Sequence, residues 1–147
     1  MSRALVPAIL AALALSALPS LADDPYAGVF VSDPAQCKAV AEKGAQAVFD
    51  ADFTILTLKD GVLGNEFTCH FADIKPAAEG QILVITAMCE EPGLQYPDLL
   101  SLSTYDDERV QLNSLYLASA AGGVGDTLPG QTLYTRCDNL SELPLVD

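Results

Sequence analysis

The sequence predicts a mainly β domain: about seven antiparallel strands in a meander, curled into a sandwich or a partly closed barrel, with one short N-terminal helix and two disulfides. Short apolar segments rich in β-branched residues recur at regular spacing between turn residues. Only one segment of the mature chain has helical periodicity, so the crossover helices that parallel strands require are missing. An even number of cysteines supplies the expectation of two disulfides.

The N-terminus has the pattern of a secretory signal peptide. Arg3 precedes an apolar run at 4–18, and small residues lie one and three positions before a cleavage point after Ala22. The run is shorter than the ~20 residues that span a bilayer. We therefore predict a signal peptide at 1–22 and a single small disulfide-stapled β domain at 23–147, periplasmic or secreted. An uncleaved N-terminal anchor is the alternative.

The composition is strongly acidic. The 147 residues include 7 basic and 20 acidic side chains, for a net charge of −13, and the loss of Arg3 with the signal peptide makes the mature charge −14. Nucleic acid and anionic membrane surfaces are not expected partners, because both require a basic face. A basic protein is the partner class that a negative field attracts. Solubility in an exported compartment is the simpler explanation of the same charge.

One helix is predicted after a short apolar strand at 26–32. Asp33 is a suitable N-cap, Pro34 suits the first helical position, and a glutamine follows at the third. Apolar residues then recur at positions i, i+3, i+4 and i+7 as far as Gly44, which favours a helix end. The pattern predicts a short amphipathic helix at 34–43.

Six further strands are predicted from apolar runs between turn residues. The Asp-Gly pair at 60–61 is a strong hairpin signal. The run at 82–89 is apolar on both faces, which indicates a central strand. The strands are expected at 53–58, 66–74, 82–89, 98–105, 110–116 and 132–137.

The four cysteines are Cys37, Cys69, Cys89 and Cys137. Their spacing contains no C-x-x-C pair, so neither a metal site nor another cofactor is expected, and an even count in an exported chain indicates two disulfides. Cys69 and Cys89 fall on consecutive predicted strands at similar distances from the turn between them. We therefore favour Cys69–Cys89 with Cys37–Cys137, and the alternative is Cys37–Cys69 with Cys89–Cys137.

His70 is the only histidine and directly follows Cys69, which suggests a thiol–imidazole pair. Side chains alternate across a strand, however, so Phe67, Cys69 and Phe71 share one face while His70 lies on the other. A catalytic dyad needs hydrogen-bond contact between its members. We therefore predict a solvent-facing His70 and assign no catalytic residue.

The remaining motifs do not match known sites. The glycines at 122–126 are not followed by Lys-Ser/Thr, so they indicate a loop rather than a phosphate site. The acidic clusters at 50–52, 90–91 and 106–108 lack calcium-loop spacing and are predicted to be solvated turns. The sequon that starts at Asn139 matters only in a host that glycosylates exported proteins.

A few positions between 28 and 137 carry a resemblance. They are Gly28-Val29-Phe30 ahead of Pro34 and Cys37, Glu66 three residues before Cys69, Cys89, and Arg136-Cys137. On these positions the chain resembles small exported bacterial disulfide-containing β-proteins of uncharacterised function. The resemblance implies a periplasmic β domain and assigns no catalytic residue.

The function that these patterns favour is that of an exported, soluble, non-enzymatic binding protein, such as a periplasmic inhibitor or a protein-interaction module. The segments at 90–97 and 117–131 are candidate contact loops, because function often lies on loops. A small secreted hydrolase and a structural envelope protein are the alternatives.

Overall fold

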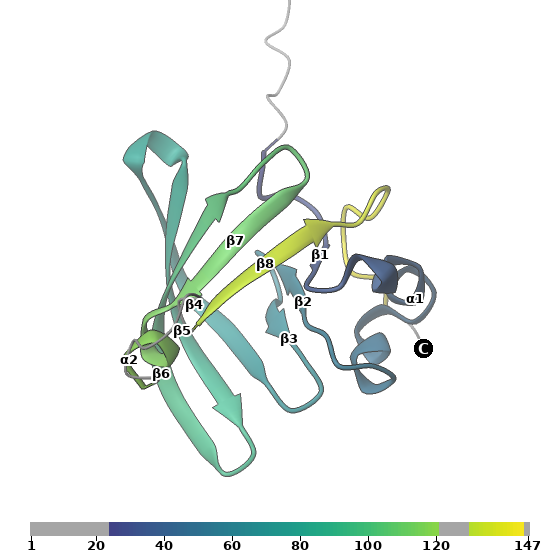
Figure 1. Ribbon diagram of the computed structural model, residues 1–147, viewed down its shortest axis with the longest axis horizontal. Coiled ribbons are helices and arrows are strands. Elements are labelled where there is room, and N and C mark those ends of the chain that lie inside the picture. The colour runs from purple at the N-terminus through teal and green to yellow at the C-terminus, as the bar shows by residue number, and fades with distance from the viewer. Residues whose placement is uncertain (1–23, 121–129, 146–147) are drawn as a thin grey trace, which may run out of the picture.

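Eight strands form a closed antiparallel barrel in which each strand pairs with its neighbours in sequence and β8 returns to β1 (Figure 1). The computed structural model describes residues 24–120 and 130–145, so the predicted signal peptide at 1–22 and the glycine segment at 122–126 lie outside the described residues. The strands are β1 (Phe30–Val31), β2 (Ile55–Thr57), β3 (Gly61–Leu63), β4 (Thr68–Ala77), β5 (Ile82–Glu91), β6 (Leu94–Thr104), β7 (Arg109–Ser114) and β8 (Gln131–Arg136). The predicted mainly β antiparallel fold is confirmed.

The predicted helix is confirmed and extends beyond its expected end. The side chain of Asp33 accepts a hydrogen bond from the backbone N–H of Ala35 at 3.0 Å, as expected of an N-cap. A 3₁₀ turn at Pro34–Gln36 leads into α1 (Cys37–Lys43), and a second 3₁₀ segment continues over Gly44–Phe49. Val40 on α1 and three residues of the second 3₁₀ segment are buried, which fixes this helical segment against the barrel.

β3 is a strand that the sequence did not predict. It pairs with β2 across the Asp-Gly turn and with the first two residues of β4. Gly61 has a φ of +87°, and a Cβ atom at this position would lie 2.0 Å from the carbonyl oxygen of Cys69. The glycine therefore provides both the turn conformation and the room for β4 to approach.

A second helix, α2 (Leu115–Ala120), replaces the predicted end of the strand at 110–116. Ser114 ends β7 and its Oγ accepts a hydrogen bond from the N–H of Leu117 at 3.0 Å. The carboxylate of Asp98 on β6 accepts one from the N–H of Tyr116, also at 3.0 Å. These two acceptors satisfy the free N–H groups of a helix start, so the chain turns into a helix after Ser114.

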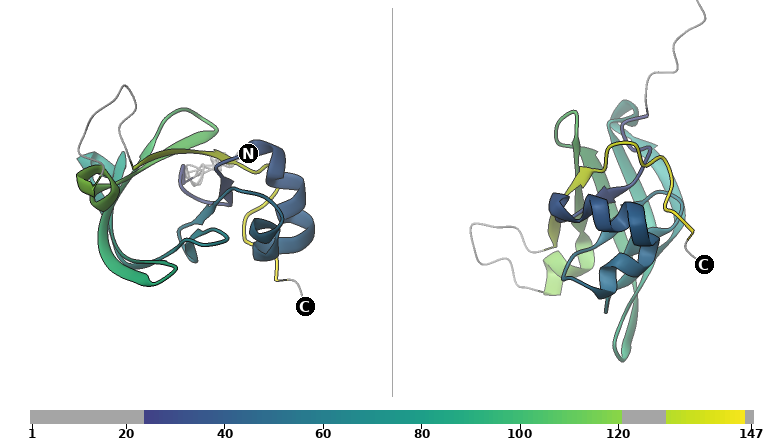
Figure 2. Two further views of the ribbon diagram at one scale, coloured as in Figure 1. Left: turned by 60° about the horizontal axis from the view of Figure 1, so that its bottom comes forward. Right: turned by 90° about the vertical axis from the view of Figure 1, so that its right-hand side faces the viewer.

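Two apolar cores hold the fold together. One fills the barrel, and the other lies between its outer wall and the helical segment, as Figure 2 shows in the view along the ring of strands. The barrel core contains Phe30, Leu56, Ile85, Leu102 and Tyr134, while Val31, Val40 and Ile55 belong to the outer core. The helical segment therefore covers β1 and β2 from outside.

One disulfide belongs to each core, and both favoured pairings are confirmed. Cys69–Cys89 joins β4 to β5 with a Cα–Cα distance of 4.0 Å, and Cys37–Cys137 joins α1 to the end of β8 at 5.3 Å. The alternative pairing is wrong. Among the described residues, none of the helices combines the length and the apolar character needed to cross a membrane.

Candidate functional site

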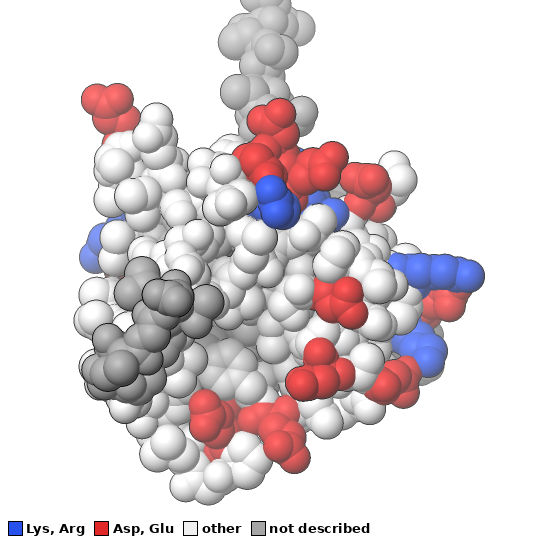
Figure 3. Space-filling model, viewed as in Figure 1, with Lys and Arg blue, Asp and Glu red and all other residues white. Residues whose placement is uncertain are grey.

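Positive charges are few on the described part of the chain, and most are neutralised locally. It contains six basic side chains, of which four form ion pairs: Lys38–Glu42, Lys43–Asp50, Lys75–Asp73 and Arg109–Asp106. Arg136 donates from Nη2 to the carbonyl of Pro25 at 2.6 Å. Figure 3 shows acidic side chains along the lower edge of one face with no basic side chain between them. The unopposed charge of this edge is therefore negative.

His70 and Cys69 lie on opposite faces of β4. Cys69 is fully buried and held in its disulfide, whereas His70 is exposed on the outer surface, opposite Met88 of β5. No thiol is available beside the imidazole. Within the described residues, the His70 side chain makes no hydrogen bond or ion pair, so it has no carboxylate to orient it as a base.

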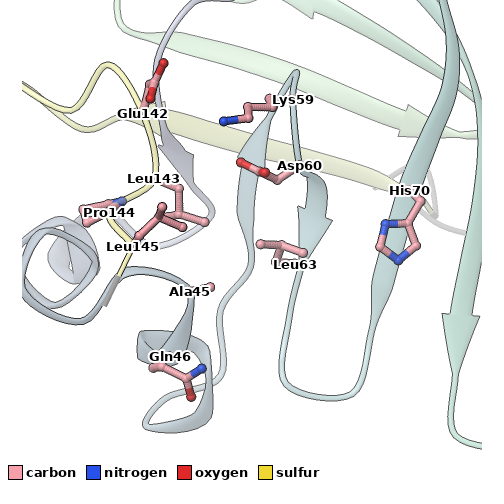
Figure 4. Close-up of a pocket in the computed structure, with 10 residues that line it drawn as sticks. All are labelled: Ala45, Gln46, Lys59, Asp60, Leu63, His70, Glu142, Leu143, Pro144 and Leu145. Carbon is pink, nitrogen blue, oxygen red and sulfur yellow. The ribbon is translucent and has the colours of Figure 1, made fainter. Parts of the chain in front are cut away.

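An open groove of about 580 Å³ lies beside His70, outside the barrel. It runs between the β2–β3 hairpin, the second 3₁₀ segment and the C-terminal segment, and Figure 4 shows His70 on its own strand, apart from the other polar side chains. The Asp60 carboxylate accepts a hydrogen bond from the Thr57 hydroxyl at 2.9 Å within its own turn. The groove thus contains a histidine and two acids, Asp60 and Glu142, but His70 is paired with neither among the described residues.

A second cavity, of about 310 Å³, opens at the end of the barrel where the β3–β4 and β5–β6 loops lie (Figure 1). Three segments contribute one carboxylate each to its lining: Asp52 before β2, Glu66 in the β3–β4 loop and Glu91 at the end of β5. Phe53, Phe67 and Pro92 provide apolar walls. We call this cavity the acidic hollow; its complete lining is Asp52, Phe53, Thr54, Gly64, Asn65, Glu66, Phe67, Glu91 and Pro92.

Backbone contacts and polar networks fix the loops around the acidic hollow. The N–H of Gly64 donates to the carbonyl of Phe67 at 2.7 Å, and a Cβ on Gly64 would lie 3.0 Å from the Thr54 methyl group. Thr54 in turn shares a 2.8 Å hydrogen bond with the Tyr134 hydroxyl inside the barrel. The β5–β6 loop is anchored by the disulfide of Cys89. The hollow therefore lies on connected, ordered elements.

Glu91 is tied to the barrel core through Tyr96. The Tyr96 hydroxyl donates to Oε1 of Glu91 at 3.0 Å, and the Tyr96 ring stacks on Tyr116 of α2 with 3.9 Å between ring centroids. Burial, and then the hydrogen bond and charge of Glu91, raise the pKa of Tyr96 above its usual range, so the folded structure favours the protonated phenol that donates to Glu91. Oε2 of Glu91 has no partner among the described residues.

The segments that line the acidic hollow could be predicted one by one, but their proximity could not. Asp52 and Glu91 belong to acidic clusters that are predicted to be solvated turns, whereas Glu66 begins the predicted strand at 66–74. The predicted contact loop at 90–97 is mostly strand, because β5 runs to Glu91 and β6 begins at Leu94, and it contributes Glu91 and Pro92 to the hollow. The predicted contact loop at 117–131 lies largely outside the described residues. No sequence motif links the three carboxylates, because they come together only when the neighbouring strands β2, β3, β4 and β5 pair side by side.

The acidic hollow is lined by carboxylates, an amide and apolar side chains. Its lining holds no serine, cysteine or histidine, and the hydroxyl of Thr54 is engaged by Tyr134. Over the described residues, no three His, Cys, Asp or Glu side chains are placed to hold a metal ion. The chain matches no protein-family model, no curated protein and no solved structure.

Proposed function

We propose that this protein is an exported, non-enzymatic binding protein that captures a basic protein partner by taking a lysine or arginine side chain into the acidic hollow. The observation that carries this proposal is that three carboxylates from three separate segments, two loops and the end of β5, line one cavity whose lining contains no basic residue. The signal-peptide pattern and the two disulfides support an oxidising, exported compartment.

The hollow offers complementary chemistry to both parts of a long basic side chain. The aliphatic stem can pack against Phe67 and Pro92, while the cationic end reaches the carboxylates of Glu66 and Glu91. An aromatic wall adds attraction for a cation that lies over its ring. Hydrogen bonds between a cation and a carboxylate are roughly twice as strong as neutral ones. A basic loop is therefore a better occupant than an apolar or acidic one.

The charge of the whole chain would assist the encounter. A net charge of −13 attracts a basic protein over distances comparable with the Debye length, about 8 Å at physiological salt. This steering acts mainly on the association rate, whereas contacts inside the hollow act on dissociation. If the partner is an enzyme with a basic loop at its active site, occupation of that loop inhibits it.

The test compares neutralisation of the hollow with neutralisation elsewhere. The triple variant Asp52→Asn, Glu66→Gln, Glu91→Gln removes the three carboxylates, and the control Glu79→Gln, Asp107→Asn, Glu108→Gln makes the same charge change in exposed turns. Crosslinked co-purification from the exported fraction at low salt should recover basic proteins with the wild type and the control but not with the hollow variant.

The purified partner should then bind the hollow variant at least tenfold more weakly by calorimetry, since each lost charged contact costs about 1 kcal/mol or more. Equal affinity for the hollow variant and the control would show that the hollow is not the binding site. Recovery of only acidic or neutral partners would contradict the partner class.

A further inference from the structure

The barrel is closed, yet β4 has a backbone partner along its whole length on one side only. β5 pairs with β4 from Thr68 to Ala77, whereas β3 pairs only with Thr68 and Cys69. No other described strand pairs with β4. Residues 70–77 therefore present one unpaired edge of the β4–β5 hairpin, which stands at the side of the barrel in Figure 1. Such an edge is a template for pairing with another strand.

The disulfide reveals which backbone groups face the open edge. The Cα–Cα distance of 4.0 Å between Cys69 and Cys89 fits a non-hydrogen-bonded antiparallel pair, since hydrogen-bonded pairs lie about 5.5 Å apart. Hydrogen-bonded and non-hydrogen-bonded pairs alternate along an antiparallel strand. Ile85 lies four residues before Cys89 on β5, so it is also in a non-hydrogen-bonded pair, and its partner on β4 is Ile74. The N–H and C=O of Ile74 therefore point away from β5, toward the open edge.

Pro76 agrees with this assignment. It lies two residues after Ile74, so its backbone nitrogen also points away from β5, toward the open edge. A proline has no N–H, and at this edge the missing N–H costs no hydrogen bond with a neighbouring strand. A bulge between Phe71 and Asp73 interrupts the strand on the other side of Ile74. Both features restrict pairing at this edge to a short stretch centred on Ile74.

The side chains around Ile74 make that stretch complementary to itself. Asp73 and Lys75 flank it on the exposed outer face and form an ion pair with each other at 2.8 Å. When two such edges run antiparallel about a two-fold axis at Ile74, Asp73 of each copy lies opposite Lys75 of the other. An axis at Asp73 or at Lys75 would instead oppose identical charges, which destabilises a strand pair.

We propose that two copies of this protein associate through the open edge of β4, as an antiparallel pair with its two-fold axis at Ile74. The Ile74 N–H and C=O groups of the two copies exchange two hydrogen bonds, and two Asp73–Lys75 contacts fix the register. The half-buried side chains of Phe71 and Ile74 gain cover on the inner face. Because the paired stretch is short, the dimer is weak and depends on concentration.

Charge reversal tests the register. Asp73→Lys makes both flanking residues positive, and Lys75→Asp makes both negative, so each variant repels itself across the axis. An equimolar mixture restores opposite charges at both contacts. Sedimentation equilibrium of the exported protein, with both disulfides formed, should show a dimer for the wild type at high concentration, monomers for each variant alone, and a heterodimer for the mixture.

The control is Lys38→Asp, which makes the same charge change as Lys75→Asp at a side chain that is 86% exposed on α1. It should associate like the wild type. The recovery in the mixture also shows that both variants are folded, because unfolded chains cannot complement each other. A wild type that stays monomeric up to millimolar concentration would overturn the proposal, as would a Lys75→Asp variant that dimerises alone or a mixture that does not recover.

Discussion

The buried side chain of Tyr134 makes the stability of the barrel depend on pH. Its ring is 2% exposed on β8, and its hydroxyl shares a hydrogen bond with Thr54 at 2.8 Å. Burial raises the pKa of Tyr134 to about 12, since a phenolate inside the barrel would lose its solvation, and the hydrogen bond with Thr54 opposes this in part. The phenol of Tyr134 therefore holds its proton more tightly in the folded state than in the unfolded state.

We predict that Tyr134 makes the protein less stable as the pH rises from 10 to 12. The unfolded chain releases the phenol proton near pH 10, whereas the folded chain retains it up to about pH 12, so the stabilisation present below pH 10 is lost across this window. The loss is about 2 to 3 kcal/mol for two pKa units. Urea unfolding at several pH values measures it, and Tyr134→Phe should show a shallower decline than the wild type.

Thr54→Val provides the matched control for this pH dependence. It removes the hydrogen-bond partner of Tyr134 but keeps the buried phenol, so the decline above pH 10 should remain at least as steep as in the wild type. If Tyr134→Phe and the wild type lose stability in parallel between pH 10 and 12, Tyr134 does not titrate as we describe.

At the scale of elements, α2 depends on two acceptors that also contact each other. The Ser114 hydroxyl donates to the Asp98 carboxylate, and each residue caps one N–H of the first helical turn. Both side chains are only 7% exposed, so loss of one leaves the other buried with fewer partners. The start of α2 is therefore a small cooperative network.

We predict that Ser114→Ala and Asp98→Ala each destabilise the protein by about 1 to 2 kcal/mol, through loss of a cap and an unsatisfied buried group. Because the two residues share one network, the double variant should lose less than the sum, by about 1 kcal/mol. Urea unfolding of the wild type, the two single variants and the double variant measures this difference. Additive losses would show that the Asp98–Ser114 contact contributes no coupling.

The elements that the sequence predicted are those whose pattern spans several residues. Seven strands were predicted from apolar runs between turn residues, and the helix after Asp33 from its cap and helical periodicity. In β3 the two apolar residues Val62 and Leu63 lie between Asp60-Gly61 and Gly64-Asn65, so they form no run that stands apart from the turn residues. α2 was missed because its capping partner Asp98 lies 16 positions from Ser114, so only tertiary structure supplies the cap.

At the scale of the whole molecule, the order of the strands explains both what was predicted and what was not. The pairing of Cys37 with Cys137 follows from a sheet whose first and last strands meet, and the β1–β8 pairing confirms this. The acidic hollow forms at one end of the neighbouring strands β2 to β5, but a carboxylate at such a position has no sequence pattern that marks its distant neighbours. The disulfides could therefore be predicted from the sequence, whereas the acidic hollow could not.

The two staples should differ in what they do to the unfolded chain. Cys37–Cys137 joins residues 100 positions apart and Cys69–Cys89 residues 20 apart. In the chain-entropy model, the long loop contributes about 4.7 kcal/mol and a short one of this order about 3 kcal/mol, both by restricting the unfolded state. Alanine at Cys69 and Cys89 also leaves a space in the barrel core, so the stabilities of the two variants alone do not separate the loops.

The denaturant slope does separate them, because it reports the surface exposed on unfolding. We predict that replacing Cys37 and Cys137 by alanine raises the urea m-value more than replacing Cys69 and Cys89, since the longer loop keeps the unfolded wild-type chain more compact. Equilibrium urea unfolding of the two double variants and the wild type gives the slopes. A larger change in m-value for the Cys69–Cys89 variant would mean that this disulfide, and not Cys37–Cys137, has the greater effect on the compactness of the unfolded chain.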